Sequence, residues 1–263
     1  MMTATQFEIS VLIRTLGNPN LLNVALQSLR QQVFKNFQIV IIEDGPPTLA
    51  DFLSHFSDMA IHYESTGIRS GRSRSGNRAL SAAVGNYFVF LDDDDFFYPD
   101  HLSNLIAQTQ SGNNPIVYSW SEQRSIERAE DGHIIKTGRI KRIRRESFSL
   151  LHLIAGNYIP INAVLFHRSL HEKAGGFDDD LEYLEDWLLW LRYAAHVPFW
   201  PCTRKATAVY NVALNKKSYA SRRKIIRSQI GYIDKVVSQI KPVWGLDVLR
   251  HEMGLHATKI SVV

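Results

Sequence analysis

The chain has 263 residues, 45% of them hydrophobic, which is enough to bury a sizeable core as one α/β domain, with or without a helical extension. Its formal net charge of +4 is mildly basic, which suits an anionic ligand but identifies none. The single cysteine, Cys202, excludes an internal disulfide and leaves no cysteine partner for a zinc site, so we expect a reduced, cytoplasmic setting.

The N-terminal segment carries no recognisable export signal. Residues 1–10 contain Glu8 and lack a basic start followed by an apolar core. No stretch of the chain reaches the roughly 18 apolar residues of a spanning helix. We therefore expect a protein that is neither secreted nor integral to a membrane.

The first half of the chain alternates short apolar runs with helical patterns. Near-continuous apolar strands joined by helices predict a doubly wound, mostly parallel sheet with helices on both faces. The expected elements are strands at 9–13, 37–42, 60–63 and 87–91, a helix after Asn18-Pro19-Asn20 and a helix near 77–83, the last preceded by a Gly/Ser/Arg-rich turn.

Polar clusters follow three of these strands. In open α/β sheets ligands lie beyond the carboxyl ends of the strands, so the clusters mark the expected site. They are Arg14-Thr15 after the first strand, Glu43-Asp44 after the second, and the run Asp92 to Asp95 after the fourth.

The second half is less regular. From about residue 222, isoleucine and valine recur at spacings of four and three, which predicts a helix packed along one side. We expect a first domain of residues 1–215 and a C-terminal helical extension, residues 216–263, packed on it. The other expected elements are strands at 116–120 and 163–167, helices at 148–155 and 186–195, and a polar stretch at 121–146.

The acidic run could hold a metal ion. Four consecutive carboxylates repel one another unless a cation compensates them. Mg²⁺ typically takes one or two carboxylates and keeps its other positions for water and phosphate oxygens, which makes Asp92 and Asp94 the candidates. The alternative is a solvated acidic turn whose last aspartate caps the helix that follows.

Two further polar segments suit a nucleotide. Asp44 could accept a hydrogen bond from a base or ribose hydroxyl, or it could only form a turn ahead of Gly45. The segment 69–78 places arginines, among them Arg72, and backbone N–H groups at a helix start, where anions are favoured. That segment could equally be a solvated loop.

A carboxylate at the start of the helix at 186–195 could take part in catalysis. Asp186 could remove a proton from a hydroxyl as a general base, or it could simply be an acid favoured by the helix dipole. Trp187 could form a face on which a sugar stacks, although large aromatic residues in helices belong more often to the core.

Five motifs occur in the order and at the spacing of family 2 glycosyltransferases, and the chain resembles that family over about residues 8–212. The motifs are Asp44 in Ile-Glu-Asp-Gly, Asn77 before Arg78-Ala79-Leu80, the run Asp92 to Asp95, Gly175-Gly176-Phe177-Asp178, and Glu185-Asp186-Trp187. The resemblance implies a GT-A fold, a nucleoside-diphosphate-sugar donor (commonly a UDP-sugar), and a carbohydrate or lipid-linked acceptor. It also implies Mn²⁺ or Mg²⁺, transfer with inversion, and a role in surface polysaccharide or glycan synthesis.

The resemblance also implies roles for individual residues. Asp186 would be the base, and Asp92 and Asp94 would hold the metal. The first strand departs from the family, which often has Pro-Thr-Tyr-Asn where this chain has Arg14-Thr15-Leu16-Gly17. The family sometimes supplies a histidine where this chain has Tyr210-Asn211-Val212, so we assign no third metal ligand. The expected donor-binding residues are Thr15, Glu43, Asp44, Arg72, Asn77, Asp92, Asp93, Glu185 and Trp187.

Two other functions compete with this interpretation. A nucleotidyltransferase would need a glycine-rich phosphate loop after the first strand, and residues 14–19 make a poor one. A non-catalytic protein could bind anions or nucleic acid through the basic run 139–145, but no recognition motif accompanies the charge, so we expect no nucleic-acid partner. The same run could instead make peripheral contact with the inner face of an anionic membrane. The sequence leaves the sugar, the acceptor and the oligomeric state open.

Overall fold

The computed structural model describes residues 7–129, 133–144, 146–213, 216–245 and 247–248. Within this part of the chain, nine strands form one sheet in the order β3-β2-β1-β4-β8-β6-β9-β5, with β7 paired to β6. The strands are β1 (Ile9–Thr15), β2 (Phe37–Glu43), β3 (Ile61–Ser65), β4 (Tyr87–Phe90), β5 (Phe96–Phe97), β6 (Ile116–Arg128), β7 (Ile134–Arg144), β8 (Val164–His167) and β9 (Cys202–Ala213).

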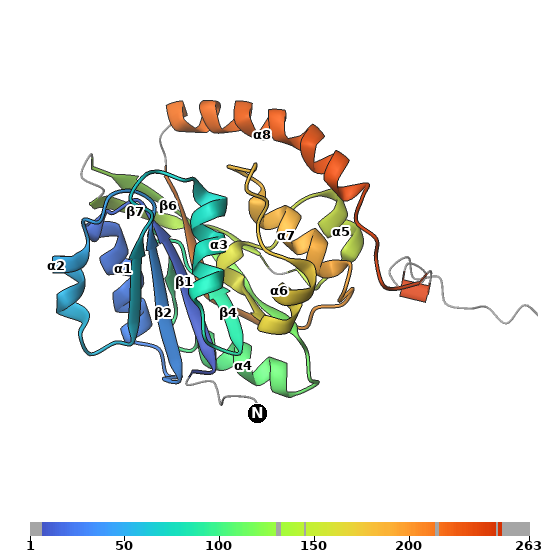
Figure 1. Cartoon of the computed structure of the whole chain (residues 1–263), viewed down its shortest axis with the longest axis horizontal. Coiled ribbons are helices and arrows are strands. Elements are labelled where there is room, and N and C mark those ends of the chain that lie inside the picture. Colours follow the sequence, from blue (N-terminus) through green and yellow to red (C-terminus); the bar gives the residue numbers. More distant parts are fainter. Residues whose placement is uncertain (1–6, 130–132, 145, 214–215, 246, 249–263) are drawn as a thin grey trace, which may run out of the picture.

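Helices cover both faces of this sheet (Figure 1). The expected α/β class is therefore confirmed. The helices are α1 (Pro19–Arg30), α2 (Ala50–Leu53), α3 (Arg72–Ala82), α4 (His101–Gln110), α5 (Leu150–Ala155), α6 (Arg168–Ala174), α7 (Glu185–Ala194) and α8 (Lys216–Val237), with short 3₁₀ turns η1 (Ser54–Phe56) and η2 (Ile161–Ala163).

Parallel pairing brings the polar clusters to one edge of the sheet. Strand β1 pairs in parallel with β2 on one side and with β4 on the other. Its last residue, Thr15, lies opposite Glu43 at the end of β2. The chain leaves β4 at this same edge and enters the acidic run, as the sequence predicts.

The alternation of side chains along β1 sorts its residues between two core layers. Val11 and Ile13 pack in the layer that contains α1 and α4. Leu12 packs in the layer that contains α3, α5 and α7. Successive side chains of a strand point to opposite faces, so Arg14 points toward α3 and α7 and Thr15 toward α1.

The polar stretch 121–146 forms strands that its composition does not predict. Strand β6 continues to Arg128 and returns antiparallel as β7, while β9 pairs in parallel along the other side of β6. Periodicity does not reveal these strands because much of the hairpin carries polar, partly exposed side chains, and pairing with β9 stabilises it.

Two helices begin earlier than predicted. Helix α3 starts at Arg72 rather than near residue 77 because the carboxylate of Asp44 accepts hydrogen bonds from the backbone just before it. Helix α8 starts at Lys216 rather than near residue 222. The sequence-based expectations for residues 1–6, 130–132, 145, 214–215, 246 and 249–263 lie outside the described residues. The same holds for the side chains of 141–144, 213, 216–224 and 227.

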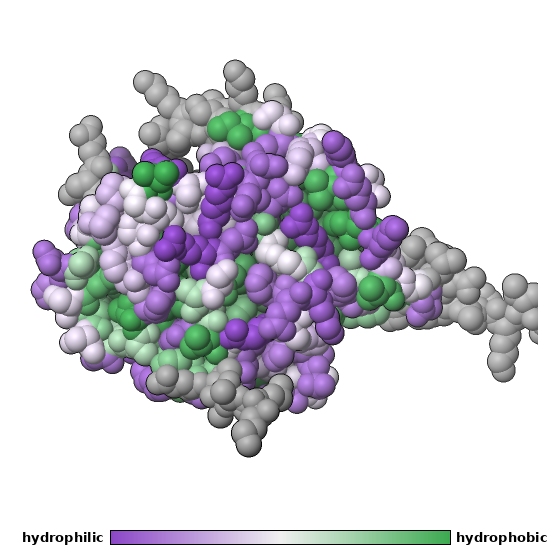
Figure 2. Space-filling view, in the orientation of Figure 1, coloured by the Kyte–Doolittle hydropathy of each residue, from purple (hydrophilic) through white to green (hydrophobic). Residues whose placement is uncertain are grey.

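Helix α8 crosses the top of the molecule in Figure 1 and contacts α7. Ile233 is buried against Leu181 and Leu188, and the Tyr232 hydroxyl donates to Asp178 at 3.1 Å. None of the described helices is long and apolar enough to cross a membrane. Hydrophilic residues cover most of the centre of the face in Figure 2, with hydrophobic residues in smaller groups toward its sides.

Candidate active site

Two cavities meet at the carboxyl edge of the parallel strands. The first has a volume of about 790 Å³ and contains Asp44 and Thr15 in its lining. The second has a volume of about 340 Å³ and contains Asp186 and Asn157. Five residues line both, namely Arg14, Arg72, Asp92, Asp94 and Tyr183.

Asp44 organises one end of the first cavity. Its Oδ1 accepts from the backbone N–H of Ser70 at 2.7 Å and from the Ser70 hydroxyl at 2.8 Å, and its Oδ2 accepts from the N–H of Gly71 at 3.1 Å. Gly71 adopts a φ of +99°, which a residue with a side chain rarely does. The carboxylate thus shapes the loop that enters α3 and fixes where Arg72 begins the helix.

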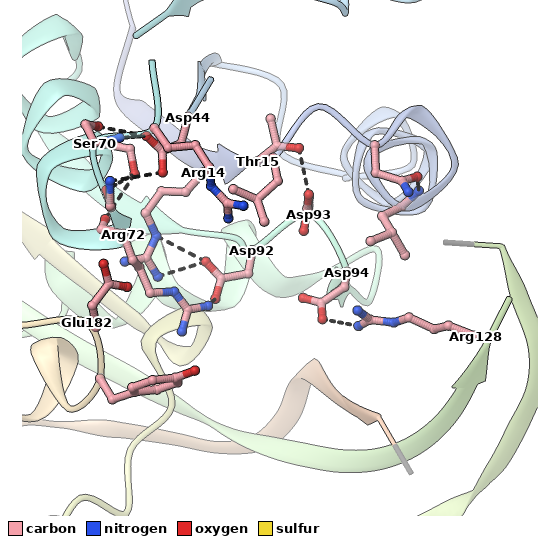
Figure 3. A pocket seen from close by; sticks show the side chains of 17 residues that line it. Arg14, Thr15, Asp44, Ser70, Arg72, Asp92, Asp93, Asp94, Arg128 and Glu182 are labelled. Atoms are coloured by element: carbon pink, nitrogen blue, oxygen red, sulfur yellow. Dashed lines mark hydrogen bonds and ion pairs between the residues drawn. The ribbon is translucent and has the colours of Figure 1, made fainter. Parts of the chain in front are cut away.

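Asp92 lies between two arginines (Figure 3). Its Oδ1 accepts from Arg14 Nη2 at 2.8 Å and Nε at 3.2 Å, and its Oδ2 accepts from Arg72 Nη2 at 2.7 Å. Arg14 also donates through Nη1 to Glu185 Oε1 at 3.1 Å. Both oxygens of Asp92 therefore already accept charged donors.

Asp93 and Asp94 have weaker compensation. Asp93 accepts from the Thr15 hydroxyl at 2.6 Å, and Asp94 pairs with Arg128. Desolvation, followed by the charge of Asp94, raises the pKa of Asp93 to about 7. Desolvation, followed by the charge of Asp92, also raises the pKa of Asp94, although Arg128 opposes the shift. These carboxylates therefore carry a repulsion that a bound cation would relieve.

The oxygen atoms around Asp94 suit a hard divalent cation. Asn211 donates from Nδ2 to the Asp94 carbonyl at 2.5 Å and from its backbone N–H to Asp95 Oδ1 at 2.7 Å. The Oδ1 of Asn211 is buried without a hydrogen-bond partner among the described residues. In that part of the chain, no three His, Cys, Asp or Glu residues form a group that could hold a metal ion, so any cation here would also need amide, water or phosphate oxygens.

Asp186 lies in the second cavity, in the first turn of α7. Its Oδ2 accepts from Asn157 Nδ2 at 2.9 Å, and its Oδ1 accepts from the Trp187 N–H at 2.8 Å. Desolvation, followed by the charge of Glu185, raises the pKa of Asp186 to about 7. A carboxylate with this pKa can accept a proton near neutral pH.

Leu184, just before this helix, has a φ of +64°, which is rare for a residue with a side chain. This left-handed residue ends the preceding loop and places Glu185 and Asp186 in the first turn of α7. The helix then carries Leu188, Leu189 and Trp190 into the core. The strain is located directly beside the candidate base.

Three of the predicted donor-binding residues line neither cavity. Glu43 accepts from the Thr48 backbone and hydroxyl. Asn77 joins α3 to the following loop, since its side chain both donates to and accepts from the backbone of Phe177. Trp187 donates through Nε1 to the Leu153 carbonyl at 2.6 Å and packs against the core.

The structure adds residues that no local pattern assigns. Arg128 reaches Asp94 from the unpredicted end of β6, and Asn157 reaches Asp186 from the loop after α5. Arg14 and Asn211 also belong to the site, and for each of these two residues the sequence holds one signal. Arg14 differs from the proline of the resembled family, and Asn211 stands near the position of its histidine.

Comparison with known proteins gives a family match. The sequence model of glycosyl transferase family 2 matches residues 10–173, more than half of the chain. YwdF of Bacillus subtilis, an uncharacterized glycosyltransferase, is 25% identical over 192 residues, 71% of this chain and 68% of that protein. The uncharacterized glycosyltransferase RT0329 of Rickettsia typhi is 26% identical over 194 residues, 70% of this chain but only 58% of that protein, so the chain spans less than two thirds of the latter.

Solved structures share the fold. The S. aureus TarS fragment 1–349 in complex with UDP-GlcNAc has a TM-score of 0.64 and 17% identity, covering 80% of this chain and 60% of that one. The mannosyltransferase PcManGT from Pyrobaculum calidifontis in complex with GDP-Man and Mn²⁺ has a TM-score of 0.58 and 18% identity, covering 84% and 61%. The expected GT-A fold is confirmed.

Proposed function

The chain belongs to glycosyl transferase family 2, and we propose that it transfers a sugar from a nucleoside-diphosphate-sugar to an acceptor hydroxyl with inversion. The observation that carries the proposal is the shared wall between the two cavities. Asp44 lies in the first cavity, Asp186 lies in the second, and Asp92 belongs to both. This arrangement offers separate spaces for a donor and for an acceptor. Membership of this family argues against the two competing functions, a nucleotidyltransferase and a non-catalytic binding protein.

The first cavity would hold the donor. The start of α3 borders this cavity and combines backbone N–H groups with the guanidinium of Arg72. Both kinds of donor favour an anion such as the diphosphate. Asp44 would act on the nucleoside by holding the Ser70–Gly71 loop against it. Structures that share the fold contain UDP-GlcNAc or GDP-Man, and among these we propose a UDP-sugar.

A divalent cation, Mn²⁺ or Mg²⁺, fits beside Asp94. Of the two metal ligands expected from the sequence, Asp94 is the stronger, because both oxygens of Asp92 accept hydrogen bonds from arginines, whereas Arg128 pairs with one oxygen of Asp94. The Oδ1 of Asn211, which has no hydrogen-bond partner among the described residues, offers a neutral oxygen near the Asp94 backbone. When bound, the cation supplies positive charge to the departing diphosphate, a contribution of several kcal/mol in general.

Asp186 would remove the proton of the acceptor hydroxyl. Asn157 holds its Oδ2 at 2.9 Å, which orients the carboxylate within the second cavity. The attacking oxygen would approach from this cavity while the diphosphate stays in the first, so the anomeric carbon is attacked opposite its leaving group. Such an in-line displacement inverts the configuration. General-base assistance of this kind is typically worth about 10²- to 10⁴-fold in rate.

Replacing the base tests the proposal. A thermal-shift screen of UDP-, GDP- and dTDP-sugars with and without Mn²⁺ first identifies the donor. We expect Asp186→Asn to bind that donor with unchanged affinity and to lose at least about 100-fold in transfer, because the amide cannot accept the proton. Calorimetry measures the binding, and slow transfer to water measures turnover without a known acceptor.

Asp180→Asn is the matched control, since Asp180 is an exposed aspartate six positions earlier. It should keep both binding and turnover. Near-normal transfer by Asp186→Asn would remove the base assignment. A screen in which no nucleotide-sugar stabilises the protein would remove the donor assignment as well.

A further inference from the structure

Arg14 has an unusual environment for a charged side chain. Only 5% of it is exposed, and its Cζ lies 5.5 Å from the ring centre of Phe90 and 5.4 Å from that of Phe177. The guanidinium makes two hydrogen bonds to Asp92 and one to Glu185. Burying a charge is costly unless its partners compensate it, so this arrangement depends on both carboxylates.

The position of Arg14 in β1 explains why it reaches these partners. Leu12 packs in the layer of α3 and α7, and Arg14, two residues later, points to the same layer beyond the end of the strand. Phe90 occupies that layer too, so Asp92, two residues past it, turns toward the same guanidinium. Arg14 therefore stands where the two cavities meet, and it lines both of them.

We propose that Arg14 is a positioning residue that ties Asp92 of the donor cavity to Glu185, and thereby keeps the neighbouring base Asp186 aligned and deprotonated. The proposal rests on the proposed function, because it takes Asp186 as the base. A proline, which the resembled family often has at this position, carries no side-chain donor and could make neither contact.

The charges around Asp186 determine the direction in which the loss of Arg14 should shift the pKa of Asp186. Glu185, its neighbour in α7, raises the pKa of Asp186, whereas Arg72 from α3 and Arg14 from β1 lower it. The charged groups that line the cavity are Arg14, Arg72, Asp92, Asp94, Asp95 and Glu185, and Tyr158, Tyr183 and Tyr210 are its other titratable side chains. Negative charge predominates, so removing a guanidinium makes ionisation of Asp186 harder.

The test is a ¹³C NMR titration of the Asp186 carboxyl in the full chain, with the signal assigned by its loss in Asp186→Asn. We expect Arg14→Gln to raise the pKa of Asp186 by about one unit. If the role of Arg14 were merely structural, its loss would lower the pKa of Asp186 instead, because a loosened site admits water and brings the pKa toward the free value of about 3.9. An unchanged or lowered pKa would overturn the proposal.

Two further variants keep the test decisive if Arg14→Gln folds poorly. Arg14→Lys retains the charge and should produce less than half of the upward shift. Glu185→Gln removes the opposing carboxylate and should lower the pKa of Asp186. If Glu185→Gln leaves it unchanged, the proposed charge balance is wrong.

Arg30→Gln is the matched control. Arg30 also pairs with a carboxylate, Asp58, and also lies over a ring, Phe56 at 4.7 Å, but it lines neither cavity. Its loss should leave the pKa of Asp186 unchanged. A shift in this control equal to that of Arg14→Gln would show that the effect is not local.

The pH dependence of hydrolysis of the donor identified by the thermal-shift screen separates this inference from the proposed function. Because the base must be deprotonated, the acidic limb of the profile should move to higher pH in Arg14→Gln by the same amount as the pKa. Hydrolysis that survives Asp186→Asn would refute the base assignment. Hydrolysis that Asp186→Asn abolishes, with no shift in Arg14→Gln, would refute only the role of Arg14.

Discussion

The four consecutive aspartates after β4 have four different sets of partners. Asp92 turns toward α3 and α7 and accepts from two arginines, whereas Asp93 turns toward α1 and accepts from Thr15. Asp95 is buried and accepts from Asn162 at 3.1 Å and from the Asn211 backbone at 2.7 Å. Asp94 lines both cavities and its carboxylate pairs with Arg128. Its backbone carbonyl accepts from Asn211, whose own Oδ1 has no hydrogen-bond partner among the described residues.

This division of roles predicts that Asp94→Asn weakens Mn²⁺ binding in the presence of UDP by at least about tenfold. Removing a residue that only orients a metal ligand typically lowers metal affinity 10- to 100-fold. Removing a ligand itself should lower it by at least as much. Titration of free Mn²⁺ by electron paramagnetic resonance measures the affinity without requiring turnover.

The control for this variant is Asp58→Asn, which removes an exposed carboxylate that pairs with Arg30 on the surface. It should bind Mn²⁺ as the unaltered protein does. Equal Mn²⁺ affinity in Asp94→Asn and Asp58→Asn would place the cation elsewhere.

Among the elements, α3 connects most of the site. Its start is held by Asp44, its first residue is Arg72, and Ser73 donates to the Leu181 carbonyl at 2.6 Å in the loop before α7. One turn later, Gly76 lies against the ring of Phe177, where an added Cβ would come within 2.6 Å of Cε2. The helix can approach that loop so closely because residue 76 has no side chain.

Gly76→Ala should therefore destabilise the protein by about 1–3 kcal/mol, the usual cost of overpacking a core. The same change should weaken UDP binding, because a displaced α3 carries Arg72 away from Asp92. Urea denaturation measures the first effect and calorimetry the second.

Gly231→Ala in α8 should have the opposite effect on stability. An added Cβ there meets nothing within 4 Å, so the substitution should stabilise the helix by up to about 1 kcal/mol. If both alanine variants changed stability in the same direction, the close packing of α3 on Phe177 would not be the cause.

At the scale of the whole molecule, α8 packs against the loop that contains Glu182 and Tyr183. Ile233 and Tyr232 contact the loop near Asp178 and Leu181, and Gln229 accepts from the Tyr183 N–H at 3.0 Å. Since Tyr183 lines both cavities, the helix supports the site from outside the sheet. We propose on this basis that α8 is part of the functional unit.

Ile233→Ala should lower the free energy of unfolding by about 2–5 kcal/mol, because the side chain is 1% exposed and its removal leaves a cavity. For a chain of this size each kcal/mol corresponds to roughly 2–4 °C in melting temperature. Differential scanning calorimetry measures the change.

Ile230→Ala is the matched variant on the same helix, where the side chain is 41% exposed. It should stay within about 0.5 kcal/mol of the unaltered protein. Similar losses in the two variants would mean that α8 is not anchored through Ile233.

The predicted and unpredicted strands differ in what stabilises them. Strands β1 and β2 are buried throughout and consist largely of apolar residues, so their sequences alone indicate buried parallel strands. The start of β6 is predicted at 116–120, but its continuation pairs with the unpredicted β9 along residues such as Gln123 and Asn211, whose side chains carry no strand periodicity. Their conformation follows from pairing with a distant partner.

The sequence by itself predicted the α/β class, the edge of the sheet at which the polar clusters gather, and the helix start that carries Asp186, which the family resemblance then proposes as the base. It did so because burial and helix starts leave local patterns that a short window of residues displays. Only the tertiary structure decided which partner each carboxylate has. Arg14 is 78 positions from Asp92 and 171 from Glu185, and contacts at that separation depend on how the layers pack rather than on any local pattern.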